Sequence, residues 1–363
     1  MGVNVGSFAA PLICGFLGDT GNPQDFKWGF LASGIMTLFT VVLFETQKNK
    51  YLFSPSGEPI GIVPDARREK KEDKAEHISH PKMDKRTKVR NIIIITALTV
   101  VLIAFFSYAF SDDWISVGIF TACIVFPVLI LLDGSLTKVE RSRIFVIYIV
   151  AFFVIFFWAA YEQAGASLTL FASEQTDRSI FGWEMPASWF QSFNPLFVVI
   201  LAYIMPGIWG FLNKRNMEPA SPTKQAIGLL LLSLGYLFIC FGVKDAIPGV
   251  KVSMIWLTGL YFIHTMGEIA LSPIGLSMVN KLSPLRFASL MMGIWYLSTA
   301  TANKFAGMLS GLYPEDGKVK SILGYQIATM YDFFMLFVIM SGVASLILFL
   351  LSKKLQKMMH GVE

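Results

Sequence analysis

The segment 253–273 reads SMIWLTGLYFIHTMGEIALSP, and Glu268 is its single acidic or basic residue apart from His264. A bilayer core about 30 Å thick needs roughly 20 predominantly apolar residues per helix, so this segment predicts a helix that crosses a membrane. A charged side chain at that depth is costly, and such residues usually face a cavity or a partner. Glu268 is therefore a candidate functional residue.

Outside this segment, eight more stretches of the chain have a similar length and apolar character. They are 28–44, 92–110, 114–132, 144–162, 194–212, 226–243, 287–309 and 327–351. A further apolar stretch, 3–17, is too short to span a bilayer comfortably. The composition agrees, because only 15% of the 363 residues are charged and 54% are hydrophobic, which leaves too few charges to cover a soluble protein. We therefore predict an all-α, polytopic membrane protein.

The lysines and arginines are distributed unevenly between the connecting segments. Alternate connections hold 23 of these residues on one side of the predicted membrane and 6 on the other. The richer set comprises 45–91, 133–143, 213–225, 280–286 and 352–363. Because cytoplasmic loops carry the excess of positive charge, we expect the C-terminus to be cytoplasmic.

The connection 45–91 is charged, and its part 64–90 is nearly free of aromatic residues, which is typical of a solvated linker. His77 and His80 have a spacing that can chelate a metal, but no third ligand lies nearby, so we expect no metal site.

A net charge of +5 gives no patch for nucleic acid. Three scattered cysteines also argue against a disulfide framework or a zinc site: Cys14, Cys123 and Cys240.

Two more charged residues lie in or at the ends of predicted spans, Glu162 and Lys304. Each has an ordinary structural explanation beside the functional one. Glu162 ends its span and would then be an interfacial carboxylate in headgroup water, and Lys304 would extend its ammonium group to the membrane interface. For Glu268 the ordinary explanation is a buried acid held by a structural partner.

Residues four apart share a helix face, so His264, Glu268 and Ser272 form one stripe, followed at once by Pro273. A helix broken at membrane depth is tolerated where it lines a cavity or is buried in protein. A carboxyl group in such a place can exchange a proton, as proton coupling requires. A lone histidine is more often hydrogen-bonded to a neighbour. Asn194 either caps its helix or points into a central cavity.

Five strings resemble those of the proton-dependent oligopeptide transporters, the peptide-transporter branch of the major facilitator superfamily. They are GVNVGS (2–7), FWAAYEQ (157–163), FQSFNPLF (190–197), GEIALSPIGLS (267–277) and GIWYLS (293–298). They occur in the family's order, and the stretch 92–132 resembles the two-helix insert of bacterial members.

The resemblance implies a partial major facilitator fold in five parts. These are the last two helices of the first bundle (1–44), a cytoplasmic linker (45–91), an inserted hairpin (92–132), a complete C-terminal six-helix bundle (144–351) and a cytoplasmic tail (352–363). It implies proton-coupled symport of di- and tripeptides across a bacterial inner membrane, with no enzyme activity and no cofactor.

The resemblance also implies roles for seven residues. Glu268 would bind the amino terminus of the peptide, and Glu162 would carry the coupling proton. The residues expected to contact the rest of the peptide are Asn4, Trp158, Asn194, Ser272 and Trp295. This set suits a zwitterionic peptide, which needs a carboxylate for its ammonium group, amides for its backbone and broad apolar walls for varied side chains.

The family's first helix carries an acid-acid-Arg motif, its second an Arg and its fourth a Lys, and this chain resembles the family only from the fifth helix onward. We therefore expect the polypeptide alone not to transport, and we expect the missing N-terminal helices to be its partner. Two alternatives are a membrane subunit or scaffold that does not transport, and a symporter of another small solute. A membrane enzyme is disfavoured because no HExxH or GxSxG string is present.

Overall fold

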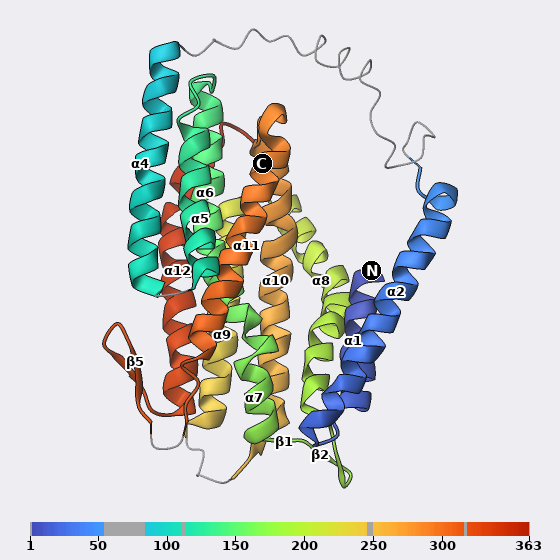
Figure 1. The fold of residues 1–363 in the computed structure, drawn as a ribbon. Coiled ribbons are helices and arrows are strands. Elements are labelled where there is room, and N and C mark those ends of the chain that lie inside the picture. The colour runs from blue at the N-terminus through green and yellow to red at the C-terminus, as the bar shows by residue number, and fades with distance from the viewer. Residues whose placement is uncertain (1, 54–83, 111–112, 245–249, 316–317, 363) are drawn as a thin grey trace.

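The computed structural model describes residues 2–53, 84–110, 113–244, 250–315 and 318–362 (Figure 1). Almost all of this part is helical. The α-helices are α1 (Gly2–Gly18), α2 (Phe26–Tyr51), α4 (Lys85–Phe110), α5 (Trp114–Leu131), α6 (Lys138–Tyr161), α7 (Ser167–Glu174), α8 (Phe193–Lys214), α9 (Ser221–Val243), α10 (Met254–Leu282), α11 (Ala288–Ser310) and α12 (Met330–Met358).

All nine predicted spans are helices in the structure, which confirms the all-α class. Eight of the described helices are long and apolar enough to cross a membrane: α2, α4, α5, α6, α8, α9, α10 and α12. The helix α11 covers the predicted span 287–309 but is not among the eight, because serines, threonines, Asn303 and Lys304 lower its hydropathy. The helix α1 is shorter, with 17 residues.

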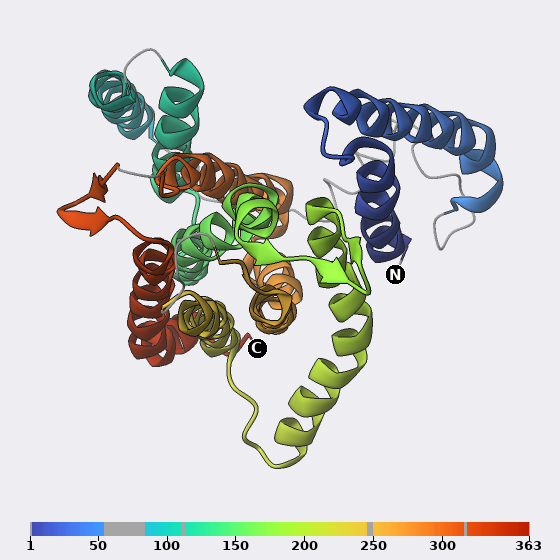
Figure 2. The same ribbon diagram turned by 90° about the horizontal axis from the view of Figure 1, so that it is seen from below.

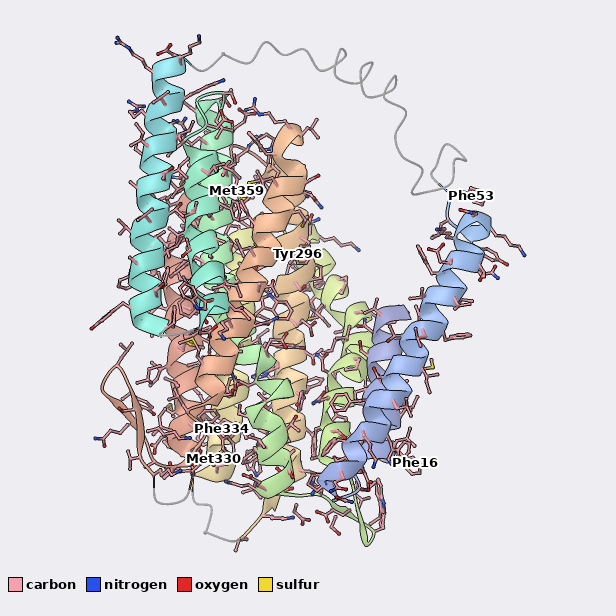
Figure 3. All side chains as sticks on the ribbon, viewed as in Figure 1. Phe16, Phe53, Tyr296, Met330, Phe334 and Met359 are labelled. Atoms are coloured by element: carbon pink, nitrogen blue, oxygen red, sulfur yellow. The ribbon has the colours of Figure 1, made fainter. Side chains whose placement is uncertain are left out.

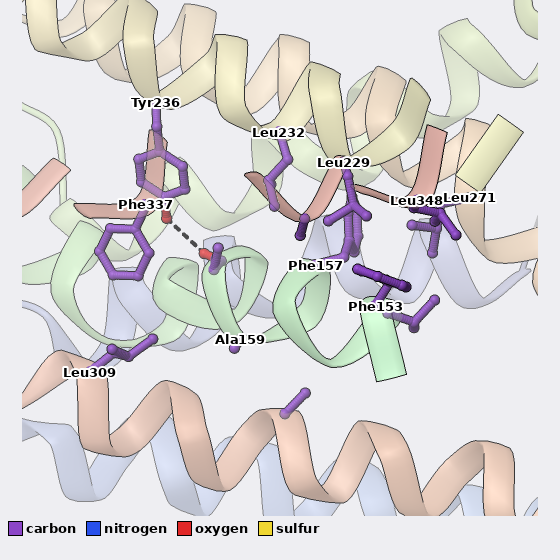
Figure 4. Close-up of a cluster of buried hydrophobic side chains, with 14 of the residues drawn as sticks. Phe153, Phe157, Ala159, Leu229, Leu232, Tyr236, Leu271, Leu309, Phe337 and Leu348 are labelled. Atoms are coloured by element: carbon purple, nitrogen blue, oxygen red, sulfur yellow. Dashed lines mark hydrogen bonds between the residues drawn. The ribbon is translucent and has the colours of Figure 1, made fainter. Parts of the chain in front are cut away.

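The last helices form one bundle, in which α9 packs against α10 and α12, and α6 packs against α11 and α12 (Figures 1 and 2). Aromatic side chains fill its centre. The rings of Tyr236 on α9 and Phe337 on α12 stack with centroids 4.8 Å apart. The Tyr236 hydroxyl donates to the carbonyl of Ala160 on α6 at 2.6 Å (Figure 4). This bond satisfies the one polar atom of a fully buried side chain.

Two glycines bring the backbones of α9 and α10 into direct contact. A Cβ atom on Gly267 would lie 2.8 Å from the carbonyl oxygen of Gly228, and one on Gly228 would lie 2.9 Å from the carbonyl oxygen of Gly267. Small residues at such a crossing let membrane helices approach closely. Because Gly267 directly precedes Glu268, this crossing fixes the position of the acid in the bundle.

The helix α10 does not break at Pro273, contrary to the expectation from sequence. It continues to Leu282 with Pro273 inside it. The amide of Gln225 on α9 donates to the carbonyl oxygen of Leu271 at 2.9 Å. This side chain braces the backbone next to the proline, which itself lacks an N–H.

The helices α1 and α2 form a pair that stands apart from the bundle beside α8 (Figures 1 and 2). The pair is attached through α8 and the preceding 3₁₀ turn Ala187–Ser192, where the Ser192 hydroxyl donates to the carbonyl oxygen of Phe8 at 2.9 Å. Much of its apolar surface is exposed, as Phe16 illustrates at the outer edge (Figure 3). Such a surface suits lipid or further helices.

The helices α4 and α5 pack on each other, and α5 packs on α11. The described ends of the predicted linker 45–91 are helical, because α2 continues to Tyr51 and α4 begins at Lys85. Residues 54–83, which include His77 and His80, lie outside the described part of the chain.

The remaining elements are short and connect the helices. The strands pair as β1 (Thr176–Asp177) with β4 (Val252–Ser253) in parallel, and as β2 (Ser179–Ile180) with β3 (Trp183–Glu184) and β5 (Lys320–Ile322) with β6 (Tyr325–Ile327) in antiparallel. The other 3₁₀ turns are Pro23–Asp25, Glu162–Gly165 and Leu285–Phe287.

Candidate functional site

Three helices meet at the carboxylate of Glu268 on α10. The hydroxyl of Tyr161, the last residue of α6, donates to its Oε2 atom at 2.5 Å. The side-chain amide of Asn194, the second residue of α8, donates to the same oxygen at 2.8 Å. The three residues are distant in sequence, so the bundle itself builds this cluster.

The amide of Asn194 has further acceptors around it. Its Nδ2 atom lies 3.0 Å from the hydroxyl oxygen of Thr265 on α10 and also within hydrogen-bond distance of the Tyr161 hydroxyl. Thr265 donates its own proton to the carbonyl oxygen of Tyr261 at 2.7 Å, so its oxygen is free to accept. Of the two roles considered for Asn194, the structure therefore has the amide directed toward α6 and α10 and not used as a helix cap.

The partners of Glu268 are neutral, and both bind the same oxygen. Among the described residues, no hydrogen bond reaches the Oε1 atom, and no lysine, arginine or histidine forms an ion pair with this carboxylate. The side chain is only half-buried. A carboxylate that has one oxygen fixed by neutral donors is suited to bind a cationic group with the other oxygen.

Aromatic side chains surround the Tyr161 end of the cluster. The Tyr161 ring stacks on that of Phe157, with centroids 5.5 Å apart and an angle of 18° between the planes. Trp158 meets it edge-on at 5.3 Å and is itself half-buried. These contacts fix the direction of the Tyr161 hydroxyl and put Trp158 next to the acid's main donor.

Glu162 directly follows Tyr161, and its side chain is exposed. It begins the 3₁₀ turn Glu162–Gly165, in which the buried side chain of Gln163 donates to the carbonyl oxygens of Ala159 at 3.1 Å and Ala306 at 3.0 Å. Gln163 thus fastens the end of α6 to α11. Tyr161 therefore lies beside two carboxylates. Glu162 follows it in the chain, and Glu268 accepts its hydrogen bond.

The other predicted site residues lie outside the hydrogen bonds that join Tyr161, Asn194, Thr265 and Glu268. Ser272 is half-buried one turn beyond Glu268, and Asn4 is half-buried on α1. Trp295 is buried on α11 with its ring against Gly275 of α10, where a Cβ atom would lie 2.5 Å from its Cζ2 atom.

Neither Tyr161 nor Thr265, which complete these hydrogen bonds, was assigned a binding role from the sequence alone. Thr265 lies three residues before Glu268, on the same helix face, and that spacing was the available signal. The contact of Tyr161 with Glu268 had no local signal, because the two are 107 positions apart.

Two other polar residues have structural partners. His264 is buried, with Nε2 3.2 Å from the carbonyl oxygen of Leu232, as expected for a histidine bonded to a neighbour. The ammonium group of Lys304 lies 2.5 Å from the carboxylate of Asp113, at the start of α5, instead of extending alone to the interface. In the described ranges, no group of three or more His, Cys, Asp or Glu side chains is placed to hold a metal ion.

Comparison with known proteins adds a family match. Residues 76–330 match the model of the POT family. The chain is 30% identical over 321 residues to the peptide transporter YePEPT of Yersinia enterocolitica, covering 86% of this chain and 60% of that protein. The chain thus spans about 60% of the length of this relative.

Two further similarities extend over the chain. It is 27% identical over 380 residues to a di-/tripeptide transporter of Lactococcus lactis subsp. cremoris, covering all of this chain and 68% of that protein. It also resembles a crystal structure of a mutant peptide transporter POT in complex with alafosfalin. The TM-score is 0.72 and the identity 28%, and the match covers 99% of this chain and 67% of that one.

Proposed function

The chain belongs to the POT family, whose members are transporters and not enzymes, and from this premise we propose that it is part of a proton-coupled symporter of di- and tripeptides in a bacterial inner membrane. The names of the relatives support a peptide as cargo. The observation that carries the proposal is the carboxylate of Glu268, held by neutral donors from α6 and α8 in a bundle of apolar helices.

In this proposal Glu268 binds the ammonium group of the peptide. All di- and tripeptides with a free amino terminus share that group, so recognition through it tolerates varied side chains. Trp158 supports apolar side chains of the cargo beside Tyr161, and Asn194 contributes its amide. Asn4, Ser272 and Trp295 complete the contacts with the peptide.

Glu162 takes up the proton that drives transport. Its exposed side chain suits exchange with water, and its neighbour Tyr161 reaches Glu268 directly. The proton site and the ammonium site are then connected through Tyr161. Tyr161 precedes Glu162 in the chain and is hydrogen-bonded to Glu268. Release of the peptide follows when the acids are protonated again.

The cationic groups for the carboxylate end of a peptide would come from the additional N-terminal helices of a longer protein, packed against α1 and α2. By this account the 363-residue chain alone binds membrane but does not transport. The uneven distribution of lysine and arginine supports a cytoplasmic C-terminus.

Uptake of labelled dialanine into proteoliposomes tests the proposal. The liposomes contain either this chain or the product of the complete gene, with or without an inward proton gradient. We expect gradient-driven accumulation with the complete product and none with the chain alone. Accumulation that ignores the gradient would refute proton coupling, and no uptake by either would favour a scaffold or another cargo.

A further inference from the structure

The first turns of α4 carry four basic side chains, Lys85, Arg86, Lys88 and Arg90, and all four are exposed. Within the described residues none of them forms an ion pair, although Asp84 stands directly before them. Basic groups at the start of a helix also oppose the helix dipole, so they do not stabilise the helix themselves.

Other basic residues near the same end of the molecule do have partners. Arg286 pairs with Glu140 at 3.4 Å, and Lys224 pairs with Glu218. The guanidinium of Arg143 donates to the carbonyl oxygen of Met359 at 3.1 Å. The four basic residues of α4 have no such partners among the described residues.

The next turns of α4 are apolar and face outward. Ile93 is 61% exposed and Ile94 is 42% exposed, and the most apolar window of the helix has no buried residue. At 1.5 Å per residue, the basic side chains begin within about 12 Å of these isoleucines. The headgroup region is about 5–7 Å deep on each side of the hydrocarbon core, so Arg90, about 4.5 Å along the axis from Ile93, lies at headgroup depth when Ile93 is at the edge of the core.

The rotation of α4 is set by Asn91, whose amide donates to the carbonyl oxygen of Leu132 at 2.7 Å. At about 100° per residue, the face opposite Asn91 holds a shallow hollow of about 450 Å³. Its lining residues are Lys85, Arg86, Val89, Arg90, Ile93 and Ile94. Three cations thus lie around Val89 and next to the exposed Ile93 and Ile94, and this end of α4 projects beyond the neighbouring helices (Figure 1).

We propose that this hollow, which we call the α4 groove, binds an anionic phospholipid, with the phosphate-bearing headgroup on Lys85, Arg86 and Arg90 and an acyl chain along Val89, Ile93 and Ile94. The charge of the groove complements an anionic headgroup, and its apolar strip complements the chain below it. A soluble anion would use only the charged half. The inference concerns the hairpin and does not depend on transport.

Native mass spectrometry of the purified 363-residue chain tests the groove by titration with phosphatidylglycerol and with phosphatidylcholine. The variant Lys85→Gln/Arg86→Gln/Arg90→Gln is compared with Lys353→Gln/Lys354→Gln/Lys357→Gln, which removes three exposed lysines near the end of α12. We expect phosphatidylglycerol to bind the groove variant about tenfold or more weakly and the control nearly as well as the wild type. Equal binding by all three proteins, or equal losses in both variants, would overturn the proposal.

Two further experiments test whether the charges themselves bind the lipid and whether the groove prefers a lipid to free phosphate. The variant Lys85→Arg/Arg86→Lys/Arg90→Lys keeps the charges and should keep the affinity, and a tenfold loss in it would contradict headgroup pairing. Inorganic phosphate at millimolar concentration should leave bound phosphatidylglycerol in place. Displacement by phosphate at constant ionic strength would show that the groove is an anion site and not a lipid site.

Discussion

At the scale of single residues, recognition depends on which oxygen of Glu268 is occupied. Tyr161 and Asn194 both donate to Oε2, and neither neutralises the carboxylate. Such fixed neutral donors hold the acid in one orientation and leave its Oε1 atom open to a ligand. This is the arrangement that an amine-binding group needs.

Replacing Glu268 with Gln tests the charge alone, because the amide has nearly the same shape. We expect the affinity for dialanine, measured by equilibrium binding, to fall about 10-fold to 100-fold, as for loss of a hydrogen bond to a charged group. The matched ligand is N-acetyl-dialanine, which has no ammonium group and should bind the variant and the wild type equally weakly. A parallel loss for both ligands would show that Glu268 acts only on structure.

Replacing Tyr161 with Phe removes the hydroxyl that donates to Glu268 and leaves the ring contacts with Phe157 and Trp158. We expect an approximately 3-fold to 10-fold weaker affinity for dialanine, the usual range for one hydrogen bond. Tyr148→Phe on the same helix is the control, since its hydroxyl only meets the sulfur of Met291 at 3.6 Å. If both variants bind like the wild type, Tyr161 does not position the acid.

At the scale of elements, hydropathy predicts where helices exist better than where they end. The span predicted from residue 144 begins at Lys138, because Thr137 and Glu140 form a capping box and the helix continues through charged residues. The helix α10 continues past Pro273, and Gln225 of α9 donates to the carbonyl oxygen of Leu271 beside it. A hydropathy window leaves out helical turns that contain charged residues. Neither hydropathy nor a local motif shows a hydrogen bond that comes from another helix.

The crossing of α9 and α10 makes a prediction for Gly267. A methyl group there would meet the carbonyl oxygen of Gly228, so Gly267→Ala should destabilise the bundle by about 1–3 kcal/mol in thermal unfolding in detergent. Gly293→Ala on α11 is the control, because no heavy atom lies within 4 Å of its added Cβ. Equal unfolding temperatures for the two variants would contradict the close crossing.

The hairpin is joined to the bundle by Asp113 and Lys304. The ammonium group of Lys304, helped by Ser116, lowers the pKa of Asp113 from 3.8 to about 2. The pair therefore stabilises the fold fully above about pH 4 and loses this effect as the pH falls toward 2. Between pH 5 and 8 its contribution should not change.

A double-mutant cycle in thermal unfolding checks this pair with Asp113→Asn and Lys304→Met. The amide of Asn keeps an acceptor for the backbone N–H of Ser116. We expect each single variant to unfold at a lower temperature at pH 7, and the double variant to lose less than the sum of the two. Strict additivity would mean that the ion pair does not hold the hairpin.

At the scale of the whole molecule, the sequence predicted most of the fold and only part of the site. Glu268 and Asn194 were recognisable from their strings, and the structure brings them together. Their connection through Tyr161 was not recognisable, because it depends on how α6, α8 and α10 pack. Local patterns report the face of a helix on which a residue lies, but a hydrogen bond between distant helices is a property of the assembled bundle.

The central claim is that the surroundings of Glu268 form a water-filled binding site for a peptide amine. Ser272→Cys in a chain without its native cysteines tests it by the rate of reaction with a membrane-impermeant thiol reagent. Val343→Cys, on an exposed apolar face of α12, is the lipid-facing control. We predict reaction at position 272 and not at 343, slowed by dialanine but not by N-acetyl-dialanine. No reaction at position 272 from either side of the membrane, or a rate that dialanine leaves unchanged, would contradict the account.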